Sequence, residues 1–299
     1  MELGIIDLGR TGAAIVRTLL ASGYRCVVWD PRPRRVAELA AEKAHGAASL
    51  QDLANELDAP RSIWLTGAAS TIDQVIGDVL PRLEADDIIV DCTDSHFADA
   101  VRRAAELARL HVAYVDVGIS GGAAYPEYGR CLTVGGDADA IRTINPILSS
   151  LACGARYVRC GPAGSGHYAN MIHQGIERSL IAIYSEAFGI LRAADIAGTE
   201  LNLADIADAW QHGSLVASPL LEITARALAD DAVLTVTPAS RRNMHDQWSA
   251  IRTAVEQDVP VPVLASAIYS AGERGEFANR LVAAVQRERT RPRLPEVHS

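Results

Sequence analysis

Short apolar runs alternate with helical periods along the first half of the chain. Runs rich in β-branched residues, of the length of buried strands, cover residues 3–7, 26–30, 62–66, 88–91 and 113–117. Amphipathic segments with apolar residues at helical spacing lie between them, for example 13–22 and 34–42. This alternation is typical of βαβ units and predicts a Rossmann-type, doubly wound parallel sheet of about six to eight strands.

The pattern changes at about residue 164, where strand signals nearly vanish and long helical stretches begin. The stretch from 170 to 194 exceeds six turns at about 3.6 residues per turn and has few polar interruptions. A helix that is apolar nearly all round must be covered, either by the rest of the chain or by a partner subunit. The sequence therefore predicts three parts: an α/β domain over 1–163, an all-helical domain over 164–290 and a flexible tail over 291–299.

Composition supports the predicted fold class, and charge narrows the kinds of molecule that the protein is expected to bind. Hydrophobic residues make up 49% of the chain and aromatic residues only 5%, which suits helices packed on a parallel sheet. The net charge of −9 disfavours binding to nucleic acid or to an anionic membrane. Four arginines near the end are expected to lie in a solvated tail and not in a binding arm: Arg287, Arg289, Arg291 and Arg293.

The cysteines indicate a reducing compartment, and the apolar runs are too short for a membrane span. Five cysteines are widely spaced and form no CxxC pair, so neither a disulfide framework nor a metal site is expected. The amino terminus runs directly into a strand pattern, and no apolar run approaches about 20 residues. We therefore expect a cytoplasmic protein without a membrane span.

A glycine-rich turn follows the first strand. Its glycines, Gly9 and Gly12, have the spacing that lets a backbone approach a pyrophosphate while the following helix end supplies N–H donors. Asp7 occupies the place of the motif's first glycine and brings a carboxylate close to the turn. The candidate cofactor-binding residues of this turn are Leu8, Gly9, Arg10, Thr11 and Gly12.

Asp30 ends the second strand, where a carboxylate can accept hydrogen bonds from the ribose hydroxyls of NAD and would repel the 2'-phosphate of NADP. NAD is therefore the expected cofactor. NADP is the less favoured alternative, because Arg32, Arg34 and Arg35 are close enough in sequence to neutralise a phosphate. An ordinary βα turn that binds no dinucleotide is the other interpretation of these residues.

Three further segments carry a family resemblance. LGIIDLGRTGAAIVRTLLASGY, VDVGISGG and GPAGSGHYANMIHQGIE, in this order and spacing, resemble the short-form, NAD-type 6-phosphogluconate dehydrogenases of the β-hydroxyacid dehydrogenase family. The likeness extends to about residue 285. It implies a homodimer in which the helical domain binds substrate and buries its long helix. It also implies that the nicotinamide lies near residues Thr66, Gly67 and Ala68, where the family has a VP pair at the last two positions.

The resemblance assigns substrate contacts to several positions. It implies that Ser120, Gly121 and Gly122 form the turn that binds a substrate carboxylate, and that His167 keeps a family position. The family's lysine, which takes the proton from the hydroxyl being oxidised, is Asn170 here. An amide has no usable proton affinity near neutral pH and carries no charge to stabilise an enolate. The neighbouring family asparagine is Gln174, and a family tyrosine is Arg178.

An acid or base remains at Glu177, which the resemblance identifies with the residue that protonates the enediol carbon. Asn170, His173, Gln174 and Glu177 are three or four residues apart and therefore share one helical face. His173 and Asp94, the latter in place of a family asparagine, are the other candidate acid/base groups. Structural roles are the alternatives: a core histidine at 173, an ion pair at 177 with Arg178 or another helix, and a helix-entry residue at 170.

The arginine with which the family binds a sugar phosphate is absent, since Gly272 stands in its place, although Arg274 is near enough to replace it. These changes favour an NAD-dependent enzyme acting on a polyhydroxylated, unphosphorylated sugar, sugar acid or nucleoside. A redox-neutral dehydratase or epimerase, an imine reductase and a catalytically inactive NAD-binding regulatory protein are the alternative functions.

Overall fold

The computed structural model describes residues 2–122, 125–154, 156–230, 245–269 and 275–289 of the chain. These form two compact units. The first consists of Met1–Gly122 and Pro126–Asn170, and the second of Ala123–Tyr125 and Met171–Ser299. The segment 291–299, expected to be a tail, lies outside the described residues, as do Gly272 and Arg274.

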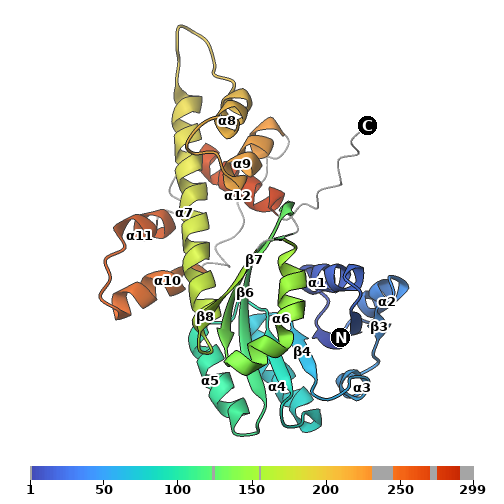
Figure 1. Ribbon diagram of the computed structural model, residues 1–299. Coiled ribbons are helices and arrows are strands. Elements are labelled where there is room, and N and C mark those ends of the chain that lie inside the picture. Colours follow the sequence, from blue (N-terminus) through green and yellow to red (C-terminus); the bar gives the residue numbers. More distant parts are fainter. Residues whose placement is uncertain (1, 123–124, 155, 231–244, 270–274, 290–299) are drawn as a thin grey trace. The chain divides into compact units, whose positions relative to one another are not determined.

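An eight-stranded sheet forms the centre of the first unit, with the strand order β3-β2-β1-β4-β5-β6-β7-β8 (Figure 1). The pairs β3–β2, β2–β1, β1–β4, β4–β5, β5–β6 and β7–β8 are all parallel. The predicted doubly wound sheet is confirmed. The strands are β1 (Glu2–Ile6), β2 (Arg25–Trp29), β3 (His45–Gly46), β4 (Ser62–Leu65), β5 (Ile88–Asp91), β6 (Ala113–Gly122), β7 (Tyr125–Gly136) and β8 (Tyr157–Gly161).

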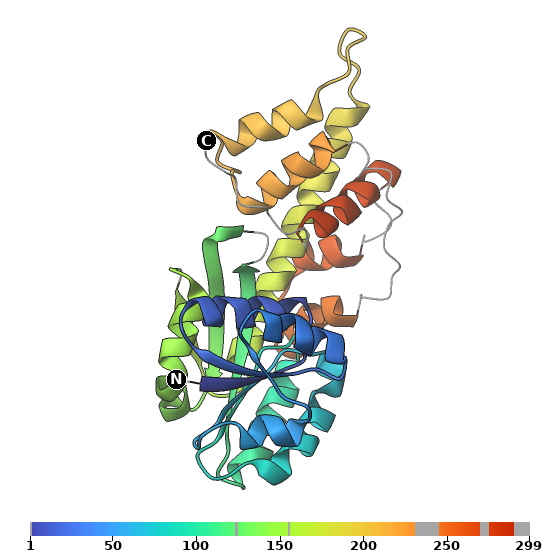
Figure 2. The same ribbon diagram turned by 90° about the vertical axis from the view of Figure 1, so that its right-hand side faces the viewer.

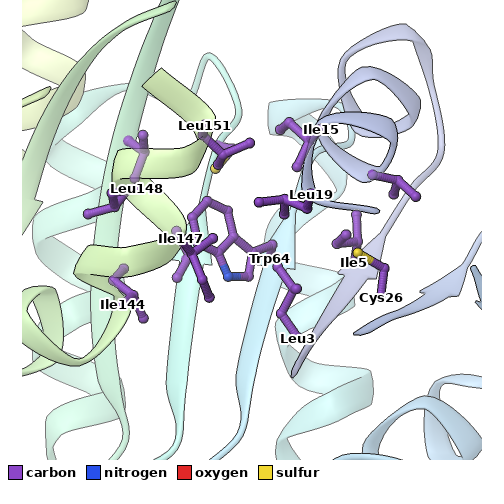
Figure 3. Close-up of a cluster of buried hydrophobic side chains, with 14 of the residues drawn as sticks. Leu3, Ile5, Ile15, Leu19, Cys26, Trp64, Ile144, Ile147, Leu148 and Leu151 are labelled. Carbon is purple, nitrogen blue, oxygen red and sulfur yellow. The ribbon is translucent and has the colours of Figure 1, made fainter. Parts of the chain in front are cut away.

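Helices cover both faces of this sheet. Buried side chains of α1, α2 and α6 pack on one face, and those of α3, α4 and α5 pack on the other. Figure 3 shows the fully buried Trp64 between Leu19 of α1 and Ile147 of α6. These helices are α1 (Arg10–Ala21), α2 (Pro33–Ala41), α3 (Leu50–Asn55), α4 (Ile72–Val79), α5 (Phe97–Ala108) and α6 (Ala138–Ala152).

The described part of the second unit is helical, as predicted. Ile181 and Phe188 of α7 pack in a core with residues of α8, α9 and α12, and these helices gather beside α7 in both ribbon views (Figures 1 and 2). A helix, α10, begins at His245 directly after the undescribed segment 231–244. The helices are α7 (Ser165–Ala193), α8 (Leu203–Gln211), α9 (Pro219–Ala229), α10 (His245–Glu256), α11 (Pro262–Tyr269) and α12 (Glu276–Glu288).

Strand register brings the loops after β1, β4 and β5 to one edge of the sheet. Leu65 of β4 pairs with Ile6 of β1 and with Asp91 of β5, and Asp91 pairs with Asp116 of β6. Because the carboxyl ends of parallel strands meet at one edge, the loops that follow Ile6, Leu65 and Asp91 lie along a common edge of the sheet. Open α/β sheets bind their ligands at such an edge, where the strand order reverses. Here the order reverses between β1 and β4.

None of the helices in the described ranges is both long enough and apolar enough to cross a membrane.

Candidate functional site

The turn between β1 and α1 is held in a tight backbone path. Asp7 has a φ of 69°, a left-handed conformation that aspartate tolerates better than most residues. Any side chain at Gly12 would collide with the Asp7 carbonyl and the Thr66 hydroxyl, so glycine is required there. Thr66 donates its hydroxyl proton to the Ile6 carbonyl at 3.1 Å. Three more predicted residues are exposed around this turn: Arg10, Thr11 and Ala68.

The Asp7 carboxylate points back over the turn. Its Oδ1 accepts a hydrogen bond from the Gly9 amide at 3.1 Å and lies 3.5 Å from Arg35 Nη1. Its Oδ2 would lie 2.9 Å from a Cβ at Gly67. The tight turn through Gly9 and Gly12 and the start of α1, which no side chain caps, fit a dinucleotide diphosphate. The carboxylate is the one feature of the turn that opposes it.

Asp30 is buried and already has four donors. Its side chain has no exposed surface, and it accepts hydrogen bonds from the Leu8 amide at 2.7 Å and the Arg32 amide at 2.8 Å. Arg32 Nε and Arg35 Nη1 each donate at 3.1 Å. Burial alone would raise the pKa of Asp30, but these hydrogen bonds outweigh it and lower the pKa below its usual value. The carboxylate thus fixes both arginines beside the turn.

A buried polar network shapes the loop after β5. Asp91 accepts hydrogen bonds from the Thr93 hydroxyl at 2.7 Å, from Tyr114 at 2.6 Å and from Arg103 at 3.2 Å. Arg103 also donates to Ser95 at 2.8 Å. Burial and the charge of Asp91 raise the pKa of Tyr114. The network holds this loop rigidly, with the candidate residue Asp94 exposed near its tip.

Asp116 of β6 fixes the start of α7. Its two carboxylate oxygens accept from the amides of Gly164 and His167, each at 2.7 Å, and the residue has no exposed surface. His167 Nε2 lies 3.2 Å from the Asp91 carbonyl. His167 Nδ1 is buried and makes no hydrogen bond within the described part of the chain. The start of the helix is therefore attached to the end of β5 and to the interior of β6.

Asn170 lies against the strand that leads to the predicted substrate turn. Only 5% of the residue is exposed, and its Cβ is so close to Gly118 that no side chain fits at that glycine. The predicted turn residues follow at the end of β6, where Gly121 has a φ of 80° that favours glycine. The first unit thus brings Asn170 to the strand that carries Ser120, Gly121 and Gly122.

In the second unit, Glu177 forms an ion pair. Its Oε2 lies 2.6 Å from Arg289 Nη2, and its Oε1 lies 3.8 Å from His173 Nδ1. The expectation that Arg289 belongs to a solvated tail is therefore wrong, because the end of α12 directs this guanidinium to α7. Arg178 donates to Gln174 at 3.4 Å along the same helix.

Sequence reasoning missed the roles of two charged residues. Asp116 is an acid inside an apolar strand, two residues before Gly118, and this placement was a signal that it binds something buried. Arg289 lies among other arginines near the end of the chain, and its local sequence gives no sign of a partner 112 residues away. In the described residues, no group of His, Cys, Asp and Glu side chains is arranged to hold a metal ion.

Comparison with known families decides the classification. Residues 2–161 match the model of the NAD binding domain of 6-phosphogluconate dehydrogenase, and residues 166–290 match that of the C-terminal domain of the same enzyme. The chain belongs to the 6-phosphogluconate dehydrogenase family. The expected family is confirmed, and the protein is an enzyme of the NAD(P)-dependent oxidoreductase class.

Individual relatives agree with this classification. The NAD⁺-dependent, decarboxylating 6-phosphogluconate dehydrogenase of Haloferax volcanii is 34% identical over 94% of this chain and 94% of its own length. YqeC of Bacillus subtilis, provisionally named a 6-phosphogluconate dehydrogenase, is 31% identical over 96% of this chain and 97% of its own. The solved 6-phosphogluconate dehydrogenase of Plasmodium falciparum is 26% identical with a TM-score of 0.81. That match covers 92% of this chain and only 62% of the Plasmodium chain.

Replacing Asp116 by alanine should lower the free energy of unfolding by about 2–4 kcal/mol, because two charge-assisted hydrogen bonds are lost and two amides are left buried. Urea denaturation followed by circular dichroism measures this loss. Asp137→Ala is the matched control: Asp137 also accepts from two helix-start amides, at 2.8 and 3.1 Å, but at an exposed site, so its loss should be about 1 kcal/mol. Equal losses in the two variants would contradict the role assigned to Asp116.

Proposed function

We propose that the protein is an NAD-dependent dehydrogenase of a polyhydroxylated, unphosphorylated small molecule, such as a sugar, a sugar acid or a nucleoside. The observation that carries this proposal is Asn170, an amide buried against Gly118 where the family's catalytic lysine is expected. An uncharged amide orients a hydroxyl by hydrogen bonding but does not deprotonate it or stabilise an enolate. The chemistry of the family's decarboxylation is therefore disfavoured here.

In this proposal residues 1–163 bind the dinucleotide and supply one substrate-binding turn, and residues 164–290 form the substrate and dimerisation domain. Gly9 and Gly12 admit the diphosphate, while Thr66, Gly67 and Ala68 adjoin the nicotinamide. The cofactor, when bound, supplies the group that accepts or returns a hydride. The five cysteines are free, which suits a reducing compartment such as the cytoplasm.

NAD is the proposed cofactor in preference to NADP. The carboxylates of Asp30 and Asp7 lie beside the same two arginines, with separations of 3.1 Å to Arg32 and Arg35 from Asp30. Guanidiniums that are already paired with carboxylates offer little to a 2'-phosphate. The relative from Haloferax volcanii, named as NAD⁺-dependent, supports the same choice.

Glu177 is the proposed general acid or base, with His173 and Asp94 as further candidates. The Arg289 guanidinium holds one oxygen of Glu177 at 2.6 Å, which fixes the orientation of the carboxyl group. The other oxygen lies towards His173, whose buried Nδ1 makes no hydrogen bond in the described chain. The two groups are 3.8 Å apart, and a proton relay between them requires the imidazole to move closer to the carboxylate.

The substrate contacts are assigned to Ser120, Gly121 and Gly122 at the end of β6, and to His167, Gln174 and Arg178 on α7. An unphosphorylated substrate is proposed because Arg178 donates to Gln174 along its own helix and Arg289 is paired with Glu177. A phosphate would have to compete for each of these guanidiniums with a partner already in place.

The experiment that tests this function is a screen of sugars, sugar acids and nucleosides with NAD, followed both by NADH absorbance and by mass spectrometry of products. Net NADH formation with an oxidised product supports the dehydrogenase. A new product without net NADH formation would indicate a redox-neutral dehydratase or epimerase. An amine formed from ketone and ammonia would indicate an imine reductase. No binding of NAD or NADP in calorimetry would refute all of these enzymatic proposals.

Replacing Glu177 by glutamine should lower kcat by about 100-fold or more, because removing a general acid or base costs roughly this factor. KM should change little, since the amide keeps the shape of the side chain. Steady-state kinetics on the substrate found in the screen measure both constants. The matched control is Glu222→Gln, which alters another arginine-paired glutamate, 3.5 Å from Arg226 in α9. Full turnover by the Glu177 variant would remove this residue from the mechanism.

A homodimer is the proposed assembly, with α7 at its interface. Three isoleucines at intervals of seven residues form an exposed stripe on this helix: Ile176 (49% exposed), Ile183 (49%) and Ile190 (74%). A seven-residue apolar repeat is the pattern by which helices pack side by side. Exposed apolar surface of this regularity is typical of a protein interface.

Replacing Ile183 by aspartate should convert the dimer to a monomer, because the substitution buries an unpaired charge in the middle of the stripe. Size-exclusion chromatography with light scattering measures the mass. Val101→Asp, at a valine of α5 that is 51% exposed, should leave the dimer intact. A monomeric wild-type protein at micromolar concentration would contradict the proposed assembly.

A further inference from the structure

The carboxylate of Asp7 lies where a dinucleotide site needs open backbone. In a glycine-rich turn the second glycine is required because the pyrophosphate approaches its backbone closely. Here a Cβ on Gly9 would lie 3.5 Å from Asp7 Oδ1, so the open side of the glycine faces the carboxylate. The Gly9 amide already donates to the same oxygen at 3.1 Å.

The same oxygen also lies close to two cations. Asp7 Oδ1 is 3.5 Å from Arg35 Nη1 and 3.9 Å from Arg32 Nη2. Both arginines are also paired with the buried Asp30. Amide donors and guanidiniums are the groups that bind phosphate in proteins. In the free protein they therefore bind a side-chain anion of the chain itself.

The chain also provides space for this anion. Oδ2 of Asp7 would lie 2.9 Å from a Cβ at Gly67, so a larger residue at position 67 would have to displace the carboxylate. The side chain is 28% exposed, which leaves it a path away from the turn. Asp7 and Gly67 thus fit one another, and the carboxylate is able to leave without unfolding the loop.

We propose that Asp7 is a built-in competitor for the diphosphate of the cofactor. In the free protein its carboxylate binds the Gly9 amide and the two arginines, and it gives them up when the dinucleotide binds. This inference rests on the proposed dinucleotide-dependent function and adds a determinant of cofactor affinity to it. Removing the charge at position 7 therefore strengthens binding, because two anions no longer have to share one small region.

A purely structural role for Asp7 makes a different prediction. Aspartate and asparagine both tolerate a positive φ, and both accept a hydrogen bond from an amide two residues ahead. If Asp7 only stabilised the turn, Asp7→Asn would leave cofactor affinity unchanged. The amide keeps the shape and the Gly9 contact and removes only the negative charge.

The test is isothermal titration calorimetry of NAD into the full-length wild-type protein, Asp7→Asn and Asp7→Gly. Glu38→Gln is the matched control, since it removes the same charge from α2 at a side chain that is 53% exposed and pairs with Arg34. We expect NAD to bind about tenfold more tightly to both Asp7 variants, with unchanged affinity in the control. Thermal unfolding of each variant confirms that the fold is retained.

Equal or weaker NAD binding by folded Asp7→Asn would overturn the inference and leave the proposed function intact. An equal gain in Glu38→Gln would also overturn it, because net charge and not position would then be the cause. If no protein of the series binds NAD or NADP, the proposed function fails together with the inference.

Discussion

The two hydrogen bonds that Asp116 accepts at the start of α7 are the constraint on which the candidate site depends. One fully buried carboxylate accepts hydrogen bonds from the amides of Gly164 and His167 and so attaches the start of the helix to β6. His167 then reaches the Asp91 carbonyl, and Asn170 lies against Gly118. The first turn of α7 is thereby fixed to the edge of the sheet that offers the glycine-rich turn.

Charge is arranged in pairs along this edge and on α7. Asp30 and Asp7 hold two arginines beside the glycine-rich turn, and Arg289 holds Glu177. Arginines paired in this way have little uncompensated charge and few N–H donors left for phosphate groups, whether on the adenosine ribose or on the substrate. The same physical arrangement supports both the proposed preference for NAD and the proposed unphosphorylated substrate.

The fold followed from local sequence, because strand periods, helix periods and the change at about residue 164 are local signals. The tight turn was predictable for the same reason, since only glycine fits at Gly12. The interaction partners of the charged residues were not predictable from local sequence. The local sequence predicts a tail for Arg289, which instead pairs with Glu177. The Leu8 amide that donates to Asp30 comes from 22 residues away in the chain, which no spacing rule identifies. Buried charges find their partners through tertiary packing, so their roles appear only in the folded protein.

The central claim is that the carboxyl edge of β1 and β4 binds a dinucleotide. A crystal structure of the protein grown with NAD tests it most directly. The account predicts the diphosphate over Gly9 and Gly12 at the start of α1, with the nicotinamide beside Thr66 and Gly67. A diphosphate bound elsewhere, or a turn still closed by the Asp7 carboxylate at saturating NAD, would contradict it.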